Sequence, residues 1–436
     1  MASGLTAALM GARKAPRLFK HTRRILHVTD HADLSTVDGR YIDSLTKALL
    51  PHGVESHLAY GQRQGALPDG LSSHVRLQAL SSEGALADTQ AGQLRDTVEA
   101  LDPDLVCVHR VHDASVIRAL DGPRRERVLL WHIHDHEPGC LTGRRAWAHE
   151  HKPVCERTLS EDCLRHVHTG RCRQAKPVRS FGVRELQARL GLLQAARRVD
   201  AIVVASDFMK QTLARHLPDT AGRIHVLPRP LPFLPAGTRT WDDGEAATVG
   251  YSGDIGPEGG LHVAIEALGH LRSDEAIVLR IAGTIRDSRY WWDCLKAARE
   301  AELRNPFLAV RHAGALDRHD LGAFYARTRI LLVPSLWADP LCAVTADALR
   351  HAVAVIASDT GAIRTCVRHG ETGLLVPPGQ PAALAHALDL LLEHPEYCDR
   401  LARNGKRFVD RDFTPHRHLE GLSAAIDSCR RVRRAG

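Results

Sequence analysis

The chain has 436 residues, more than one ordinary hydrophobic core accommodates, so we expect two domains. Its 44% hydrophobic and 25% charged residues are typical of a globular protein and exclude a disordered or fibrous chain. The formal net charge of +7 favours anionic partners without choosing among phosphorylated metabolites, acidic lipids and nucleic acids.

The N-terminal segment is basic, and no apolar run approaches the roughly 18 to 20 residues of a membrane-spanning helix. The first 24 residues contain no acid and six basic residues, which are Arg13, Lys14, Arg17, Lys20, Arg23 and Arg24. Because they lack the apolar stretch and cleavage site of an export signal, we expect a flexible basic arm over 1–24 and a cytoplasmic protein. Contact of this arm with anionic lipid at the inner face of the membrane is the alternative.

Short apolar runs alternate with helical patterns along both halves of the chain. Strands are expected at 25–29, 104–108, 128–133, 201–205 and 224–227, and then at 248–252, 277–282, 307–312, 330–334, 353–358 and 374–377. Helices are expected at 39–50, 261–271, 290–303, 340–351 and 381–392, where apolar residues recur at three- and four-residue spacing. Several strands are continuously apolar, which indicates parallel sheets covered on both faces. The expected fold class is α/β, with two doubly wound, Rossmann-like domains.

A proline-rich stretch separates the two halves. It contains Pro228, Pro230, Pro232 and Pro235, residues that interrupt both helices and sheet ladders. We therefore expect a first domain at 25–235, a second at 236–415, and a C-terminal helix at 416–436 that packs back on the first domain. Ligands of such sheets bind beyond the carboxyl ends of the strands, so we expect the site in the cleft where the two domains face each other.

The strongest local pattern lies at residues 333–378. A strand ends near Pro334, a loop carries Asp339, and a helix beginning near Pro340 places Asp347 about two turns in. These two acids, with the following strand, Gly-containing loop and GETGLLVPP turn, resemble the retaining GT-B glycosyltransferases of family 4. The resemblance implies that Asp339 contacts the donor sugar and Asp347 the donor ribose. Stabilisation of the helix N-terminus is the alternative role for such acids.

Two departures from that family concern this same region. Both acids are Asp where Glu is usual, and the reach lost, about the length of one bond, requires a deeper donor or a bridging water. In the loop SDTGAI, Gly361 is kept, whereas Arg364 stands where the family has Pro. Backbone amides of such a loop suit a phosphate, and Arg364 either adds positive charge there or faces solvent.

A second resemblance lies in VGYSGDIGPEGGLHVAIEAL, residues 249–268. Gly253 and Gly259 belong to the turn that faces the donor diphosphate in the family, where a basic residue near Asp254 and a Lys at the position of Gly259 are usual. This chain has neither cation. Losing both would cost several kcal/mol of charge stabilisation unless others substitute. Candidate substitutes are Arg229, Arg286 and Arg289, with an ordinary surface position as the alternative for each.

The first half resembles the acceptor domain of the family more loosely. The sequence VLLWHIHD ends in His134 and Asp135, and the terminal His of the matching strand contacts the donor sugar or phosphate in relatives. We therefore expect His134 to donate a hydrogen bond to the sugar or leaving group, and a hydrogen-bonded histidine at a strand end is the alternative. The later segment AIVVASDFMK also matches, with Ser206 capping the next helix.

Ten cysteines are too few for a disulfide scaffold in this chain, so we expect reduced thiols. Four of them alternate with histidines inside an insertion at about 137–180, and these are Cys140, Cys155, Cys163 and Cys172. Zinc takes four such ligands, but no CxxC or HxxxH pair is present within this insertion. A structural zinc ion, another metal or cluster, and plain thiols in an acceptor-side lid therefore stay open.

The resemblance implies a hexosyltransferase-type enzyme. It would move a sugar from a nucleotide-diphosphate sugar to an acceptor hydroxyl with retention of configuration, and it would require no cofactor. The acceptor, whether glycan, lipid-linked or small molecule, stays undefined. A non-catalytic sugar- or partner-binding protein of the same fold, such as an inactive subunit of a transferase pair, is the alternative that the missing cations favour. A nucleic-acid partner is not expected, because aromatic residues are only 5% and none alternate with a basic patch.

Overall fold

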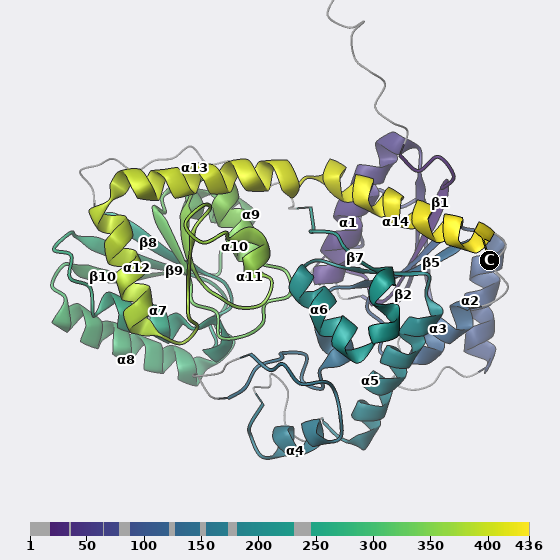
Figure 1. Ribbon diagram of the computed structural model, residues 1–436, viewed down its shortest axis with the longest axis horizontal. Coiled ribbons are helices and arrows are strands. Elements are labelled where there is room, and N and C mark those ends of the chain that lie inside the picture. Colours follow the sequence, from purple (N-terminus) through teal and green to yellow (C-terminus); the bar gives the residue numbers. More distant parts are fainter. Residues whose placement is uncertain are drawn as a thin grey trace, which may run out of the picture.

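The computed structural model describes residues 18–34, 36–63, 65–77, 88–121, 127–148, 154–172, 181–230 and 246–435. Two parallel sheets form two domains (Figure 1), which confirms the expected α/β class with two doubly wound units. The expected linker around residue 236 and residues 1–17 of the basic arm lie outside the described residues. Within the described segments, no helix combines the length and apolar character needed to cross a bilayer.

The first domain contains a seven-stranded sheet in the order β3-β2-β1-β4-β5-β6-β7. Its strands are β1 Arg24–His31, β2 Glu55–Gln62, β3 Ser73–Arg76, β4 Leu105–Val108, β5 Val128–Ile133, β6 Ala201–Val204 and β7 Ile224–Val226. Its helices are α1 Val37–Leu49, α2 Asp88–Leu101, α3 Ala114–Leu120, α4 Asp162–His168, α5 Val183–Ala195 and α6 Asp207–His216. Every strand pair is parallel, so the carboxyl ends of all strands lie along one edge.

The second domain contains a six-stranded parallel sheet in the order β10-β9-β8-β11-β12-β13. Its strands are β8 Ala247–Ser252, β9 Ile277–Ala282, β10 Leu308–Gly314, β11 Ile330–Val333, β12 Ala354–Ser358 and β13 Leu374–Val376. The helices that follow are α7 Leu261–Leu268, α8 Ser288–Arg304, α9 Arg318–Ala326, α10 Ala343–Arg350, α11 Ile363–Cys366, α12 Pro381–Glu393, α13 Pro395–Asp412 and α14 Pro415–Ala435.

The alternation of side chains along β1 separates two cores in the first domain. Leu26 and Val28 pack with helices α2, α3 and α5 on one face of the sheet. Ile25, on the opposite face, belongs to a second buried cluster that includes residues of α1 and α14. Continuous apolar strands are therefore explained by burial on both faces, as a parallel sheet requires.

The last helix of the chain packs on the first domain, although α13 before it packs on the second (Figure 1). Leu419, Leu422 and Ile426 of α14 contribute to the core beside α1. The first domain also begins before residue 25, because Phe19 is buried in this cluster and its amide donates to Ser423 Oγ over 3.3 Å. The two ends of the described chain therefore pack against each other.

Some local expectations were wrong. The sequence did not indicate β2 and β3, because polar residues such as Ser56 and His57 interrupt the apolar run. Helix α10 begins at Ala343 rather than near Pro340, since Cys342 has a left-handed conformation with φ +48° and caps the helix. Asp339 therefore lies in a loop before the helix. The expected cap is confirmed at α6, where Ser206 Oγ accepts from the Met209 amide over 3.2 Å.

The expectation that all cysteines are reduced is also wrong. Cys342 and Cys366 form a disulfide across 24 residues of sequence. Both side chains are buried, and they meet because α11 ends beneath the start of α10. The remaining eight cysteines are free thiols.

Candidate functional site

A cavity of about 860 Å³ lies at the carboxyl ends of β8 and β11 in the second sheet. Of the residues expected to bind the donor, it brings together Gly253, Asp254, Gly259, Arg286 and Asp339. Its described lining does not include His134, Arg229, Asp347, Gly361 and Arg364. Its position at a sheet edge, between domains, is where α/β proteins bind ligands.

Asp339 is held in the cavity wall by the backbone around it. Its Oδ1 accepts from the amides of Leu341 and Cys342, over 2.9 and 3.2 Å. Burial is the largest influence on this carboxyl and raises its pKa, while the two amides lower it. The other carboxylate oxygen is not used by these bonds, so it can accept from a ligand hydroxyl.

Gly361 supports Asp339 from below rather than lining the cavity. A Cβ added to Gly361 would lie 2.6 Å from both the N and the O of Asp339, and its φ of +56° is a left-handed conformation that glycine tolerates best. The amide of Ala362 donates to the Asp339 carbonyl oxygen over 2.7 Å. The loop after β12 thus fixes the backbone of Asp339.

The structure explains why Gly occupies position 259. A Cβ there would lie 2.2 Å from Tyr251 Oη, which itself donates to the Asp254 carbonyl oxygen over 3.1 Å. The tyrosine is buried and closes the space that a longer side chain at 259 would cross. Tyr251 therefore leaves no room for a lysine side chain at position 259.

Two arginines bring positive charge to this cavity. Arg286 lines it and forms an ion pair with Asp254, at 3.1 Å between Nε and Oδ2. Both side chains are more than 60% exposed, so this pair contributes little stability and can open for a ligand. Arg144 reaches the cavity from the Cys-rich insertion, with its guanidinium 5.2 Å from the centre of the Trp337 ring. Sequence reasoning missed Arg144, because its insertion resembles the family too weakly to align it.

Asp347 and Arg364 do not line the cavity. Asp347 is half-buried in α10, next to Tyr325. Arg364 is largely exposed and is paired with Asp359 through two hydrogen bonds, of which the Nη2 to Oδ2 bond is 2.7 Å. The pairing makes Arg364 a surface residue in this structure.

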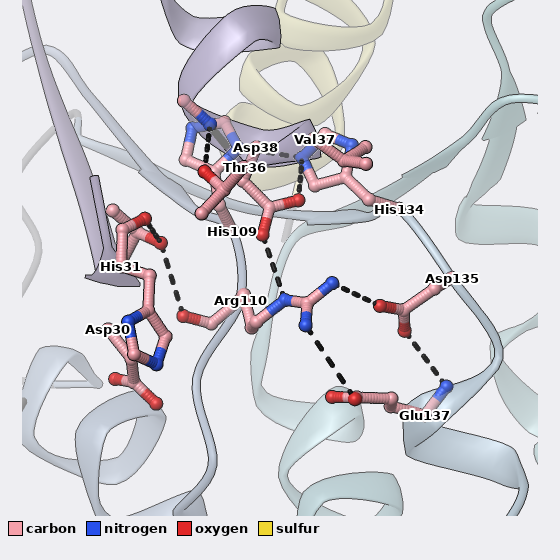
Figure 2. A network of polar contacts seen from close by, with 12 residues as sticks. Asp30, His31, Thr36, Val37, Asp38, His109, Arg110, His134, Asp135 and Glu137 are labelled. Atoms are coloured by element: carbon pink, nitrogen blue, oxygen red, sulfur yellow. Dashed lines mark hydrogen bonds and ion pairs between the residues drawn. The ribbon is translucent and has the colours of Figure 1, made fainter. Parts of the chain in front are cut away.

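A network of charges lies at the carboxyl ends of β1, β4 and β5 in the first domain (Figure 2). Arg110 Nε donates to Asp38 Oδ2 over 2.9 Å, and its Nη2 donates to Asp135 Oδ2 over 2.5 Å. Its Nη1 lies 3.6 Å from Glu137 Oε1. A single guanidinium therefore fixes three carboxylates, one from the start of α1 and two from the segment after β5.

The acids of this network have opposite shifts in pKa. Burial, followed by the nearby Glu137, raises the pKa of Asp135. Burial would also raise the pKa of Glu137, but Arg189 and Arg110 outweigh it and lower that pKa. The network contains three carboxyl groups and two guanidinium groups, those of Arg110 and Arg189, so it suits hydroxyl groups better than anions.

His134 belongs to a buried group of histidines beneath this network. His109 shares hydrogen bonds of 3.0 Å with both His27 and His134, and His134 Nε2 lies 3.8 Å from Asp38 Oδ1 (Figure 2). Ligand atoms of His109, His132 and His134 all lie within 4.8 Å of one another. Burial lowers the pKa of each of these three imidazoles well below the usual value, so they are neutral at neutral pH.

Arg229 is placed in the first domain, under the same histidines. It is half-buried, donates to the Val37 carbonyl oxygen over 2.8 Å, and its guanidinium lies 5.0 Å from the Tyr41 ring centre. Burial lowers its pKa to about 10. Its contacts are structural in this conformation and do not reach the cavity of the second domain.

One hydrogen bond joins the two sites. The Nε2–H group of His136, after β5, donates to the Ala338 carbonyl oxygen over 2.7 Å. Ala338 is adjacent to Asp339, and His136 lies between Asp135 and Glu137. The two site regions therefore face each other across a fixed contact between the domains.

Comparison with known families gives a match on each domain. A sequence model described as "Glycosyl transferases group 1" matches residues 241–408, and one described as "Glycosyltransferase Family 4" matches residues 39–232. The paired sheets and the interdomain cavity define a GT-B protein. The chain belongs to the group 1 glycosyltransferases.

Similarity to individual proteins is lower. The chain is 30% identical over 157 residues to D-rhamnosyltransferase WbpZ of Pseudomonas aeruginosa, a match that covers 36% of this chain and 38% of that protein. It is 30% identical over 164 residues to a glycogen synthase of Mycobacterium tuberculosis, covering 37% and 38% of the two chains. The matched part is thus well under half the length of these curated relatives.

Solved structures share the fold over nearly the whole chain. A glycosyltransferase from Rickettsia africae has a TM-score of 0.66 at 14% identity, covering 94% of this chain and 99% of that one. Anabaena Alr3699/HepE, solved in complex with UDP and glucose, has a TM-score of 0.62 at 14% identity, covering 94% and 100%. At these identities the likeness establishes the GT-B fold alone.

The contact between Gly259 and Tyr251 gives a first prediction. Gly259→Ala places a Cβ against Tyr251 Oη and overpacks the site, so we expect about 1–3 kcal/mol lower free energy of unfolding. Removing the hydroxyl with Tyr251→Phe should recover part of that loss. Gly222→Ala, where a Cβ meets nothing within 4 Å, is the matched control. Urea unfolding measures all four proteins, and equal stability of Gly259→Ala and wild type would contradict the contact.

The buried histidines predict acid sensitivity. Burial lowers the pKa of His27 and His136 to about 3 and that of His418 to about 4. Below about pH 6.5 the unfolded chain binds protons that the folded chain refuses, so stability is present above that pH and is lost on acidification. Each such histidine contributes up to about 1.4 kcal/mol per pH unit.

Urea unfolding at pH 7.5, 6.5 and 5.5 tests this expectation. His418→Gln should flatten the slope of unfolding free energy against pH by about one proton. His319→Gln, whose side chain is 83% exposed, is the control and should leave the slope unchanged. A slope that stays flat between pH 6.5 and 5.5 in the wild type would contradict burial of neutral imidazoles.

Proposed function

We propose that this protein transfers a sugar from a nucleotide-diphosphate sugar to an acceptor hydroxyl with retention of configuration. The observation that carries the proposal is the 860 Å³ cavity whose wall contains Asp339 together with Arg144, Arg286 and the turn around Gly259. An acid and cations in the wall of one cavity suit the sugar and the diphosphate of such a donor. Membership of the group 1 family and the UDP and glucose named with the Anabaena structure support the same donor class.

Asp339 is the residue proposed to hold the sugar. It is half-buried, its backbone is fixed by Gly361, and one of its oxygens is not used by the neighbouring amides. A carboxylate accepting from sugar hydroxyls makes charge-assisted hydrogen bonds, which are about twice as strong as neutral ones. Asp347, on the following helix, is proposed to accept from the ribose hydroxyls once the donor is bound.

Arg286 and Arg144 are proposed to replace the two cations that the family usually places near the diphosphate. Arg286 would exchange its exposed partner Asp254 for phosphate oxygens. Arg144 extends from the first domain, so it would act only when the cleft is in the arrangement seen here. Stabilising charge on the leaving group is the largest electrostatic requirement of the reaction.

The chemistry needs no further reactant. The bond between the anomeric carbon and the phosphate oxygen breaks, and the leaving nucleoside diphosphate keeps the electron pair. The acceptor oxygen forms the new bond on the same face of the sugar, and its proton passes to a phosphate oxygen. His134 and the Arg110 network lie on the acceptor side, where Asp38, Asp135 and Glu137 suit hydroxyl recognition.

A non-catalytic sugar- or partner-binding protein is the second candidate, favoured by the absence of a lysine at Gly259. Calorimetric titration with UDP, GDP, dTDP and their common sugar conjugates, followed by mass-spectrometric detection of sugar release or transfer, separates the two. Saturable binding with no release or transfer would favour the second candidate.

Substitution of Asp339 tests the donor site directly. Asp339→Asn keeps the shape but removes the charge, which is worth about 1.5–3 kcal/mol in a hydrogen bond to a charged group. We therefore expect kcat/KM to fall about 10- to 100-fold with little change in thermal stability. Asp359→Asn, which alters only the pair with Arg364, is the matched control. Equal activity of Asp339→Asn and wild type would remove Asp339 from the site.

The stereochemical outcome is a separate prediction. Transfer on the face that the leaving group vacates gives a product with the same anomeric configuration as the donor. Proton NMR of the first turnovers, read from the coupling constant of the anomeric proton, measures it before any mutarotation. An inverted product would exclude the same-face mechanism while leaving the donor site intact.

A further inference from the structure

The Cys-rich insertion is organised around one short segment, Arg145 to Trp147. The amide of Arg145 donates to Cys140 Sγ over 3.4 Å, and the Cys155 amide donates to the Arg145 carbonyl oxygen over 2.7 Å. Trp147 pairs with Cys172 in an antiparallel bridge. Three of the four cysteines are therefore bonded directly to this segment, although they are far apart in sequence.

The fourth cysteine, Cys163, lies in the first turn of α4, and its thiol lies 3.9 Å from the Thr158 carbonyl oxygen. The carbonyl oxygen of Arg157, the residue before Thr158, accepts from Arg145 Nη2 over 3.1 Å. The Cys172 amide donates to the carbonyl oxygen of His166, in the same helix α4, over 3.3 Å. Contacts of the backbone thus bring all four cysteines to the segment around Arg145.

The side chain of Arg145, whose backbone is hydrogen-bonded to Cys140 and Cys155, is only 2% exposed. Its Nη1 and Nη2 donate to the carbonyl oxygens of Gly139 and Arg157, over 3.4 and 3.1 Å, and its Nε has no partner. Among the described residues, no carboxylate forms an ion pair with it. A buried cation without a counter-charge is costly. A negative group bound near Arg145 would therefore stabilise this part of the fold.

We propose that Cys140, Cys155, Cys163 and Cys172 bind one Zn²⁺ ion as a tetrathiolate site, with Arg145 as its counter-charge. Two positive charges on the metal and four negative charges on the sulfurs leave a net charge of −2, which the buried guanidinium partly neutralises. Zinc prefers a closed, tetrahedral set of four such ligands, at about 2.3 Å from each sulfur. The amide of Arg145 that donates to Cys140 Sγ is the kind of contact that orients a ligand.

Metal binding draws the sulfurs together and releases protons. The four cysteines are not among the groups whose ligand atoms already lie within 4.8 Å of one another, so the proposed site requires their sulfurs to move closer together when the ion binds. The thiol protons leave as thiolates form, because zinc binds the deprotonated sulfur.

The histidine group in the first domain is the rival metal site. His109, His132 and His134 meet the distance condition, but both ring nitrogens of His109 already make hydrogen bonds to other histidines. The guanidinium of Arg229 lies 5.0 Å from the Tyr41 ring centre, which is itself 4.3 and 5.0 Å from the ring centres of His132 and His134, so a divalent cation there would face a nearby positive charge. Charge therefore favours the cysteine site, because the buried guanidinium of Arg145 would be balanced by the negative charge of a zinc tetrathiolate.

The zinc site would also place Arg144, the residue next to Arg145, over Trp337 in the donor cavity. This consequence rests on the proposed function, whereas metal binding by the cysteines does not. Loss of metal should therefore weaken donor binding without changing the chemistry of Asp339.

The test uses the full chain purified without a histidine tag from zinc-supplemented cells. We expect about one zinc per chain by mass spectrometry of the metal, and Co²⁺ substitution should give the sulfur-to-metal charge-transfer bands of a tetrahedral thiolate site. The double variant Cys155→Ser with Cys163→Ser should lose the metal. Cys429→Ser, on α14, and His132→Gln should keep it.

A ligand swap protects the test against simple misfolding. Cys163→His supplies another zinc ligand, so it should keep about one metal with weaker charge-transfer bands, whereas Cys163→Ser should lose it. Wild type without zinc, metal that remains in the double cysteine variant, or metal lost from His132→Gln would each overturn the proposal. Donor titration of the metal-free protein then reports on Arg144, and its failure leaves the zinc result standing.

Discussion

The hydrogen bond from His136 to the Ala338 carbonyl oxygen is the contact that brings both halves of the site into register. On one side it holds the segment after β5, where Arg110 gathers its carboxylates. On the other it holds the residue before Asp339, whose own backbone rests on Gly361. Burial lowers the pKa of His136 to about 3, so its ring is uncharged at neutral pH and this contact is a hydrogen bond between neutral groups. The relative position of acceptor-side and donor-side groups thus depends on a short chain of backbone contacts.

Positive charge reaches the cavity of the second domain from positions other than those that the family usually uses. Tyr251 fills the space above Gly259, so a cation cannot enter from the usual turn. Arg286 approaches from the loop after β9 and Arg144 from the opposite domain, and both reach the same cavity. At Gly259 the departure from the family pattern is explained by Tyr251, whose side chain occupies the space that a lysine would need.

The alternation of strands and helices, the two domains and the place of Asp339 could be predicted from the sequence, because they follow from periodicity and from a long local pattern. Arg144 could not, since it owes its position to an insertion folded around distant cysteines. Arg229 carries the same charge and was an equally reasonable candidate, yet it is half-buried beside Tyr41. Sequence shows which residues are charged, whereas tertiary packing decides which of them face the cavity.

The path of the chain has a mechanical consequence. The backbone passes from the first domain to the second after Pro230 and returns to the first between α13 and α14. The two crossings are tied to each other, because His418 near the return donates to the carbonyl oxygen of Pro228 near the departure, over 2.9 Å. The last helix therefore ties the point where the chain returns to the first domain to the point where it left that domain.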